Sequence, residues 1–430
     1  MKHTFQRGIH PEEKKELTSN CSFEAMPTGS KVYIPLTQHI GAPATPCVEA
    51  GTRVKAGTLI GKASGYVSAN VHSSVSGKVL GFRMRENAAG RKIKHVEIEN
   101  NGLYEEEHLP PLVQPTKDEI IARCKDAGIV GMGGATFPTH VKLETKSKIK
   151  FLIINGSECE PYITTDNRMM LDFPKEIIEG IGYIQTALGA SEVTIGIEAN
   201  KPRGLIAMRN AITDHPDMRI YELKTKYPQG GEKQLIYAIT KMKVPDRGLP
   251  SDVGVIVLNI STAFAIYEAV KLGKPCYSRY MTVSGGGVKR PANLFVRIGV
   301  PLAEIADYLG QNTGYVKAVF GGPMMGLSLS SLTPVTAKGS SALLLLNENE
   351  IRDIDPQPCI NCGRCASVCP IGLMPMMTDR LILKEKIAET KKFHPQSCIE
   401  CGCCAYVCPA KRPLVQSQRL AKKLIKERKI

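Results

Sequence analysis

Two cysteine-rich runs near the C-terminal end have the residue types and spacing of metal sites. They are CINCGRCASVCP over 359–370 and CIECGCCAYVCP over 398–409, each spaced C-x2-C-x2-C-x3-C-P. The four cysteines of this pattern in the second run lie at one constant offset from those in the first, so the segment is an internal duplication. Thiolates are soft ligands that suit iron–sulfur clusters, each of which takes four. The duplication therefore predicts two [4Fe–4S] clusters.

Each run supplies three closely spaced thiolates, so the fourth ligand of each cluster must come from elsewhere. In two-cluster ferredoxins with this spacing, the last cysteine of each run binds the other cluster. The predicted ligand sets are Cys359, Cys362, Cys365 and Cys408 for one cluster and Cys398, Cys401, Cys404 and Cys369 for the other. Zinc is the alternative, but zinc sites usually use two C-x2-C pairs rather than two complete runs ending in C-P. Cys403 is interpreted as a packed or partly exposed thiol rather than a ligand.

A glycine-rich stretch far upstream has the composition of a phosphate-binding loop. In TKDEIIARCKDAGIVGMGGATFPTHVKL, Thr116 and Glu119 predict a capping box for a helix that ends near residue 128. Three glycines and a lysine follow that helix: Gly131, Gly133, Gly134 and Lys142. Glycines let backbone amides approach a ligand, and amides with one lysine suit a phosphate. The loop lacks the G-K-S/T of a Walker loop and follows a helix, so a structural turn fits equally well.

Beyond the glycines, apolar strands alternate with helices, and polar residues follow the strands. KIKFLII, SEVTIGIEA, RIYELK and VGVIVLN are the predicted strands, and their order favours a mostly parallel sheet. Ligands of such sheets bind beyond the carboxyl ends of the strands. The polar residues there are Asn155, Ser157, Glu158 and Glu160, then Tyr227, Gly230, Gly231 and Glu232, then Asn259 and Thr262. A loop hydrogen bond explains any one of them, whereas several equivalent clusters indicate a shared site.

These residues carry a resemblance to known families. GMGGATFPTHVK resembles the signature G-R-G-G-A-G-F-P-T-G-x-K of the NADH-oxidising, flavin-binding subunit of respiratory complex I, and NGSECEP resembles its N-A-D-E-S-E-P. The whole chain resembles the C subunits of Rnf complexes, the ion-translocating ferredoxin:NAD oxidoreductases. That similarity includes GIHPEEKKELT and IPLTQHIGAPATPCVEAGTRVKAG near the start.

The resemblance implies FMN bound noncovalently with NAD(H) stacked over it. Gly131, Gly133, Gly134 and Lys142 would hold the FMN phosphate region, and Asn155, Ser157 and Glu158 would line the flavin pocket. Phe137 would stack on the adenine, and Glu160 would face the NAD ribose or adenine. Tyr227, Gly231 and Glu232 would lie beside the isoalloxazine, while Asn259 and Thr262 match an N-x-x-T of the family.

Two positions depart from the complex I pattern, and no catalytic base is assigned. Met132 replaces the signature arginine, and Lys233 replaces a second glutamate next to Glu232, so the contacts of those two side chains are not transferred. Hydride transfer needs no proton-transfer residue. Glu232 is hypothesised only to tune the flavin potential.

Four domains are expected, making the fold class multidomain α/β plus β. Residues 1–115 are predicted to form a barrel-sandwich (lipoyl-like) module, and 116–272 a Rossmann-like, parallel-sheet FMN/NADH domain. Residues 273–340 are predicted to form an SLBB-like (soluble-ligand-binding) β-grasp module, and 341–430 a helical two-cluster ferredoxin domain with a basic C-terminal tail. The first module resembles lipoyl and biotinyl carriers, but Tyr66 stands near the position of their lysine. It is therefore interpreted as a structural or docking piece.

Charge and hydropathy bound the location of the chain. It has 430 residues, 14 cysteines and a net charge of +15. The charged N-terminus lacks the apolar core of a secretory signal, and the longest apolar stretch is broken by polar residues, so we expect neither export nor a transmembrane span. The tail KRPLVQSQRLAKKLIKERKI, with Glu427 as its only acid, predicts either a solvated helix or contact with an acidic partner or an anionic membrane surface. Without a nucleic-acid-binding motif, nucleic acid ranks last.

A flavin beside iron–sulfur clusters converts two-electron into one-electron transfer. The expected function is the electron-input subunit of an Rnf-type ferredoxin:NAD+ oxidoreductase, peripheral on the cytoplasmic side of the membrane. Its expected partners are the other membrane and ferredoxin-like subunits. The alternatives are a cobalamin reductase of the bacterial microcompartment type, an amino-acid-reductase accessory protein, and an electron-wiring scaffold whose nucleotide pocket does not work. The carrier-like module follows the flavin domain in the cobalamin reductases but precedes it here, which favours the Rnf type.

Overall fold

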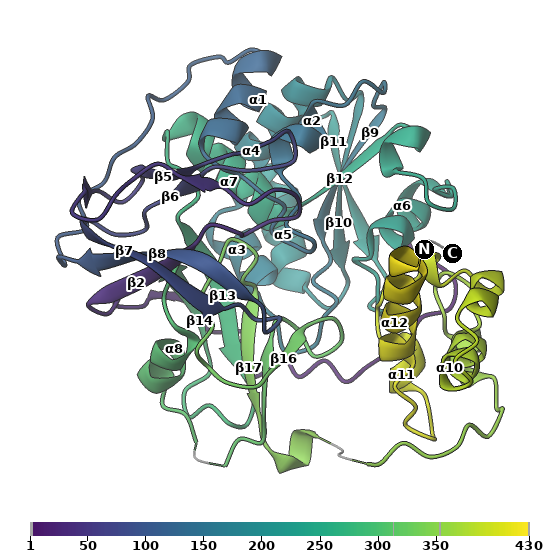
Figure 1. Ribbon diagram of the computed structural model, residues 1–430. Helices are drawn as coiled ribbons and strands as arrows, with labels where there is room; N and C mark the ends of the chain where they lie inside the picture. Colours follow the sequence, from purple (N-terminus) through teal and green to yellow (C-terminus); the bar gives the residue numbers. More distant parts are fainter. Residues whose placement is uncertain (1–2, 313, 352–353, 429–430) are drawn as a thin grey trace.

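The computed structural model describes residues 3–312, 314–351 and 354–428. Four sheets organise the chain, and the helices gather around the parallel sheet and at the C-terminal end (Figure 1). Among the described residues, no helix is long and apolar enough to cross a membrane. The basic tail lies mainly on the last helix, α12, and its final residues 429–430 lie outside the described part.

The N-terminal module is a pair of small antiparallel sheets. One has the order β2-β8-β7-β4 and the other β3-β5-β6. Their bounds are β2 (Lys31–Pro35), β3 (Thr45–Pro46), β4 (Arg53–Val54), β5 (Leu59–Lys62), β6 (Val71–His72), β7 (Gly77–Glu86) and β8 (Lys92–Asn100). Val32 and Ile34 on β2 and Val96 and Ile98 on the paired strand β8 are fully buried. On β8 the intervening Glu97 is buried as well and pairs with Lys31 and Arg83. Tyr66, at the expected lysine position of a carrier, is 63% exposed.

His72, on β6, makes the acid stability of this module predictable. Burial and the nearby Lys338 ammonium lower the pKa of His72 to about 3. The unfolded chain binds a proton at His72 below about pH 6.5 and the folded chain does not, so folding stability falls as pH decreases from there. Between pH 6.5 and pH 5 this site removes about 2 kcal/mol.

A His72→Gln variant is therefore expected to lose about 2 kcal/mol less unfolding free energy than the wild type on acidification from pH 7 to pH 5. Urea unfolding followed by circular dichroism measures the difference. The exposed His10→Gln variant is the control. Equal acid sensitivity in the wild type and His72→Gln would show that His72 is not held neutral by the fold.

The central domain confirms the predicted parallel sheet. Strands β9 (Phe151–Gly156), β10 (Glu192–Glu198), β11 (Met218–Leu223) and β12 (Val255–Asn259) are ordered β11-β10-β9-β12, and all neighbours are parallel. The helices are α1 (Lys117–Asp126), α2 (Thr139–Leu143), α3 (Thr165–Asp172), α4 (Pro174–Leu188), α5 (Pro202–Ala211), α6 (Glu232–Thr240), η1 (Pro250–Val253) and α7 (Ile260–Lys271). The predicted capping box of Thr116 and Glu119 begins α1. The β9–β12 register pairs Asn155 with Asn259, so both strands present an asparagine at the same edge.

The last of the four sheets is mixed and has the order β1-β14-β13-β17-β15-β16. Because it follows the N-terminal pair and the parallel sheet, it is called the third sheet here. Its strands are β1 (Phe23–Ala25), β13 (Ser278–Ser284), β14 (Ala292–Arg297), β15 (Lys317–Phe320), β16 (Leu327–Leu329) and β17 (Ala342–Leu346), with helix α8 (Leu302–Leu309) between β14 and β15. β1 pairs with β14, and β17 pairs with both β13 and β15. This sheet therefore draws strands from outside the expected range 273–340, at both ends.

The C-terminal part preserves the sequence duplication in its backbone. It contains η2 (Glu348–Glu350), α9 (Arg364–Ser367), α10 (Pro375–Leu383), η3 (Ala388–Phe393), η4 (Pro395–Ser397), α11 (Cys403–Tyr406) and α12 (Leu414–Glu427). Asn361 and Gly363 before α9 have positive φ, as do Glu400 and Gly402 before α11. The two cysteine runs thus form the same tight turn, each entering a short helix.

Residues 3–20, here called the N-terminal strap, join the central domain to the C-terminal part. Ile9 forms an antiparallel bridge with Tyr227, after the parallel sheet. The Gly8 amide donates to the Val368 carbonyl at 3.0 Å, and the Arg7 guanidinium donates to the Cys369 carbonyl at 3.4 Å. The strap therefore contacts both parts that are expected to hold cofactors.

Candidate functional site

The glycine loop, residues 131–136, lies against the start of α7. The Met132 amide donates to the Thr262 hydroxyl at 3.0 Å, and the Gly131 amide donates to the Phe137 carbonyl at 2.8 Å. A Cβ atom on Gly133 would come within 2.8 Å of the Asn259 side chain, so this position accepts only glycine without movement. A Cβ on Gly134 would meet nothing within 4 Å. The loop is thus closely packed behind Gly133 and open at Gly134.

The strand ends gather their polar side chains beside this loop. The Asn155 side chain donates to the Gly230 carbonyl at 2.9 Å, and the Asn259 side chain donates to the Asn155 carbonyl at 3.3 Å. Asn259 also begins α7 by accepting from the Ser261 amide at 2.8 Å. Ser157 is fully buried, and its hydroxyl has no hydrogen-bond partner among the described residues. An unpartnered buried hydroxyl beside an open loop fits a site that receives a polar ligand.

Lys142 and Glu232 meet across the same edge. The Lys142 ammonium lies 2.9 Å from a Glu232 carboxylate oxygen and also donates to the Val257 carbonyl at 2.7 Å. Glu232 opens α6 directly after Gly231, and its side chain is 42% exposed. The sequence pattern predicts both residues in the site but does not reveal that they pair with each other.

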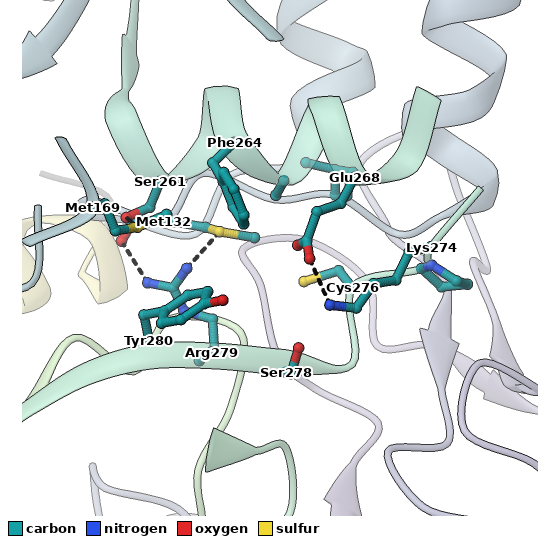
Figure 2. Close-up of a pocket in the computed structure, with 13 residues that line it drawn as sticks. Met132, Met169, Ser261, Phe264, Glu268, Lys274, Cys276, Ser278, Arg279 and Tyr280 are labelled. Carbon is teal, nitrogen blue, oxygen red and sulfur yellow. Dashed lines mark hydrogen bonds and ion pairs between the residues drawn. The ribbon is translucent and has the colours of Figure 1, made fainter. Parts of the chain in front are cut away.

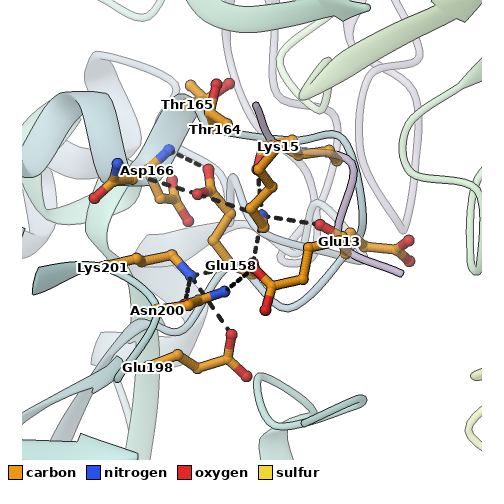
Figure 3. Close-up of polar contacts among 12 residues, drawn as sticks. Glu13, Lys15, Glu158, Thr164, Thr165, Asp166, Glu198, Asn200 and Lys201 are labelled. Atoms are coloured by element: carbon orange, nitrogen blue, oxygen red, sulfur yellow. Dashed lines mark hydrogen bonds and ion pairs between the residues drawn. The ribbon is translucent and has the colours of Figure 1, made fainter. Parts of the chain in front are cut away.

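Glu158 is turned away from solvent into a network of buried charges (Figure 3). Its side chain is 3% exposed, accepts from the Asp166 amide at 2.6 Å at the start of α3, and lies 3.8 Å from the Lys15 ammonium of the strap. Lys15 also donates to the carbonyls of Glu158 at 2.9 Å and Glu160 at 3.0 Å. Burial raises the pKa of Glu158 to about 7, against the opposing effects of Lys15 and Lys201. The Glu158 carboxylate thus has protein partners that fix the loop.

Glu160 connects the same loop to the third sheet. Its carboxylate oxygens accept from the Met324 amide at 3.0 Å and the Met325 amide at 2.9 Å. Burial raises the pKa of Glu160 to about 7, and these amides lower it. A Cβ atom on Gly322 would come within 2.3 Å of this carboxylate. The stretch FGGPMMG, residues 320–326, therefore receives the side chain of a predicted site residue.

Tyr227 lies where the parallel sheet approaches the second cysteine run. It is 1% exposed, and its hydroxyl lies close enough to the Glu160 carboxylate to help to lower the pKa of that group. The Cys403 sulfur lies 3.9 Å from the Tyr227 carbonyl. Cys159 accepts from the Gly230 amide at 3.3 Å and packs in the same apolar cluster as Tyr227, Cys401 and Cys403. Cys159 is not among the predicted site residues, although it lies within NGSECEP, at the position where the complex I motif has a serine.

The four cysteines of the second predicted set line one cavity, and Cys403 lines it with them. Cys369, from the first run, joins Cys398, Cys401 and Cys404 in its wall, as crossed ligation requires. Burial and these three neighbouring thiols raise the pKa of Cys404. No three acid, histidine or cysteine side chains among the described residues converge on one metal ion. Thiols around a cavity suit a multi-atom cluster, so the residues fit a [4Fe–4S] cube. We call this set the inner cluster site.

The first predicted set, here the outer cluster site, is more open. Cys365 and Cys408 pack in one apolar cluster, and Cys408 helps to raise the pKa of Cys365 after burial. The pKa of Arg412 is raised mainly by Asp379 and, to a smaller extent, by Cys359 and Cys408, so both thiols lie near the guanidinium. Cys359 and Cys362 are exposed. Cys408 of the second run therefore lies with the first run. Cys403 is buried, as are the predicted ligands Cys401 and Cys404, so its interpretation as a packed thiol stays a prediction.

Three family descriptions match parts of the chain. Residues 3–103 match the description "RnfC Barrel sandwich hybrid domain", 124–268 match "Nuo51 FMN-binding domain", and 354–411 match "4Fe-4S dicluster domain". The chain therefore carries an FMN-binding domain and a dicluster domain. The open glycine loop and the buried, unpartnered Ser157 hydroxyl fit the flavin nucleotide.

A solved structure supports the fold alone. The chain is similar to a chain in the crystal structure of an NAD+-reducing [NiFe]-hydrogenase in the air-oxidized state, with a TM-score of 0.52 and 19% identity. The similarity covers 70% of this chain and 63% of that one.

Curated relatives match over nearly the whole length. The chain is 42% identical to the C subunit of the proton-translocating ferredoxin:NAD(+) oxidoreductase complex of Clostridium ljungdahlii, over 91% of this chain and 87% of that protein. It is 44% identical to the C subunit of the ion-translocating oxidoreductase complex of Rhodobacter capsulatus, over 98% and 83%. It is 41% identical to the C subunit of the Na(+)-translocating ferredoxin:NAD(+) oxidoreductase complex of Acetobacterium woodii, over 99% and 98%. On this evidence, the chain belongs to the family of C subunits of ion-translocating ferredoxin:NAD(+) oxidoreductase complexes.

Proposed function

We propose that this chain exchanges hydride between NAD(H) and FMN and passes single electrons through two [4Fe–4S] clusters, as the peripheral electron-input subunit of its complex. Bound FMN accepts or returns two electrons as hydride, and each cluster carries one electron at a time. Every other contribution comes from the chain itself, which binds the cofactors, orients them and sets the distance between them.

The contact between Tyr227 and the inner cluster site carries the proposal. Tyr227 and Gly230 follow β11 at the flavin edge of the sheet, and Cys401 and Cys403 pack against that segment. Cys159 bridges the two by accepting from Gly230. The strap fixes the junction, because Ile9 pairs with Tyr227 while Arg7 holds the Cys369 carbonyl. A flavin at this edge would therefore have the inner cluster as its nearest one-electron partner.

The outer cluster site supports an exit for electrons towards another protein. Cys359 and Cys362 are exposed, and Ile360 between them is 66% exposed. An exposed apolar residue between two cluster ligands suits a short electron-transfer contact. The inner site is buried against Tyr227 and the outer site faces solvent, so we propose the order flavin, inner cluster, outer cluster, partner. The proposed partners are the membrane and ferredoxin-like subunits, on the cytoplasmic side of the membrane.

The nucleotide side of the site is proposed to combine the glycine loop with the strand ends. Gly131, Gly133, Gly134, Lys142, Asn155, Ser157, Asn259 and Thr262 would hold FMN, with Tyr227, Gly231 and Glu232 beside its ring and Phe137 and Glu160 towards NAD(H). Glu158 would act through its contacts to α3 and Lys15 rather than by touching the flavin. Glu232, paired with Lys142, keeps its proposed role in tuning the flavin potential.

We also propose that the third sheet, with α8, is a β-grasp unit.

Anaerobic reduction of the reconstituted chain tests the proposal. The chain is loaded with FMN, iron and sulfide, NADH is added, and flavin absorbance and cluster EPR are followed together. Bleaching of the flavin followed by reduced-cluster signals is the expected result. Clusters that assemble while NADH bleaches nothing would reject the NADH site and leave an electron-wiring scaffold.

Replacing Gly134 with alanine is expected to weaken FMN binding without weakening the fold. A Cβ there meets no protein atom within 4 Å, so a methyl group would project into the open cradle that the nucleotide needs. We expect the FMN dissociation constant to rise by about tenfold while the melting temperature of the FMN-free protein is unchanged. Flavin fluorescence titration measures the constant. Gly182→Ala on α4, also in open space, is the control, and equal FMN affinity in both variants would place the nucleotide elsewhere.

A further inference from the structure

Two buried cations lie behind the glycine loop, and neither is paired with a carboxylate within the described residues. Arg279, on β13, is 4% exposed, and Lys338, in the loop before β17, is fully buried. Lys338 donates to the Asn70 carbonyl at 2.5 Å and the Gly128 carbonyl at 2.6 Å. Burial lowers the pKa of Lys338 to about 8, so it remains charged at pH 7. A buried charge without a counterion is costly and needs compensation from another source.

The Arg279 guanidinium points at the second residue of the glycine loop (Figure 2). It donates to the Met132 carbonyl at 3.4 Å, contacts the Met132 sulfur, and donates to the Ser340 carbonyl at 3.2 Å. These acceptors are all uncharged. The complex I signature has an arginine where this chain has Met132. In this chain a guanidinium reaches the loop from β13 instead.

The carboxylates that face Arg279 are already engaged by other groups. Asp166 accepts from the Asn259 side chain at 2.7 Å and from the Ser261 hydroxyl at 2.9 Å. Glu268 is paired with Lys274 at 2.5 Å, on the far side of the cavity from Met132 (Figure 2). The negative charges of Asp166 and Glu268 favour the charged form of Arg279 and so oppose the lowering of its pKa by burial, but neither carboxylate forms an ion pair with it.

Residues 338–340, which include Lys338 and contact Arg279, pack directly against the glycine loop. A Cβ atom on Gly339 would come within 2.4 Å of the Thr136 methyl group, so Gly339 permits this close approach. Lys338 and Ser340 on either side make the contacts described above. The loop therefore has positive charge and close packing on one side and open space at Gly134 on the other.

We infer that Arg279 and Lys338 are positioning residues that provide the positive field for an anionic group of FMN held on the glycine loop. This inference rests on the proposed function, because it requires FMN at that loop. Two groups share the relevant chemistry, namely the phosphate and the negatively charged ring of the reduced flavin. Neither cation touches the nucleotide. Both act through the loop backbone, which they also hold in place.

The test compares Arg279→Gln with the charge-conserving Arg279→Lys. Flavin fluorescence gives the dissociation constants of FMN and riboflavin, and dye equilibration gives the midpoint potential of the bound flavin. If the phosphate is the anion, Arg279→Gln raises the FMN constant by about tenfold and leaves the riboflavin constant unchanged. If the reduced ring is the anion, its binding weakens by about tenfold relative to the oxidised ring, a fall of about 30 mV for a two-electron couple. Arg279→Lys should restore most of either effect.

Arg297→Gln is the matched control, because Arg297 lies on the neighbouring strand β14 and donates to the Ser74 carbonyl, away from the loop. If Arg279→Gln binds both flavins with wild-type constants and potential, the inference is overturned while the proposed function stands. If Arg279→Gln does not fold, Lys338→Met provides the same comparison. If the wild-type chain itself binds no FMN, the proposed function fails and this inference fails with it.

Discussion

A Cys404→Ala variant is expected to lose the inner cluster and, with it, reduction of the outer cluster by NADH. Cys404 lines the inner cavity together with Cys369, Cys398 and Cys401, and a cube with three protein thiolates is poorly retained. The iron and sulfide content should fall by half. NADH should still bleach the flavin, because the glycine loop is untouched. Reduced-cluster EPR signals should not follow, because Cys401 of the inner site packs with Tyr227, whereas Cys365 and Cys408 of the outer site pack in another cluster.

The adjacent cysteine gives a matched control for this prediction. Cys403 is fully buried on the same short helix and also lines the inner cavity, but its sulfur lies 3.9 Å from the Tyr227 carbonyl. Cys403→Ala is therefore expected to retain both clusters and the EPR response to NADH. Equal iron loss in Cys403→Ala and Cys404→Ala would contradict the assignment of Cys404 alone as the ligand on α11.

Crossed ligation adds a sharper comparison. Cys369 belongs to the first run but lines the inner cavity, so Cys369→Ala should behave like Cys404→Ala. Cys408 belongs to the second run but lies with Cys365, so Cys408→Ala should remove only the outer cluster. In that variant NADH should still reduce the inner cluster. The opposite pairing of phenotypes would mean that each run holds its own cluster.

The features that sequence predicts well here are local or periodic. The cysteine spacing encodes its ligands because each run is one tight turn, and positive φ at Asn361 and Glu400 repeats with it. The capping box at Thr116 and the alternation of apolar strands with helices are likewise set by residues close in the chain. Parallel strands then bring their polar ends together, so Asn155 and Asn259 meet without any further information.

The features that sequence misses are contacts between distant segments. Lys15 lies in a charged stretch that resembles a solvated surface, yet its ammonium is buried in the 158–163 loop. Arg279 follows no motif and reaches the glycine loop only because β13 passes behind it. Glu158 is predicted to line a pocket, but its φ of 47° turns it towards the N-terminus of α3. Strands β1 and β17 join the third sheet from outside its expected limits for the same reason.

A Lys15→Met variant is expected to lose about 3–5 kcal/mol of unfolding free energy, the usual cost of removing one partner of a buried ion pair. The Lys15 side chain is 14% exposed, and its ammonium serves the Glu158 carboxylate and the carbonyls of Glu158, Glu160 and Ile163. Without it, this loop loses the donor that fixes two residues with positive φ, Glu158 and Tyr162. The apparent affinity for NADH should also fall by about tenfold, because Glu160 lies on this loop.

The loss should grow with pH, which separates it from a simple packing defect. The pKa of Glu158 is already raised to about 7 by burial, and removing the Lys15 charge raises it further. The folded state then holds a proton that the unfolded state releases above about pH 4.5, so stability decreases as pH rises through the folded pKa. Urea unfolding of Lys15→Met should therefore show a larger deficit at pH 8 than at pH 6. Adding Glu158→Gln should remove that pH dependence.

Lys14→Met is the matched control, because the neighbouring Lys14 side chain is 37% exposed and, within the described residues, forms an ion pair only with the exposed Glu12. Its cost should stay within about 0.5 kcal/mol at both pH values. If Lys15→Met is no more destabilising than Lys14→Met, the strap does not fix the 158–163 loop. If Lys15→Met is destabilising but equally so at pH 6 and pH 8, the lost backbone hydrogen bonds account for the effect and the Glu158 charge does not. The predicted combination, a large and pH-dependent loss confined to Lys15, requires both the carbonyl contacts and the buried ion pair.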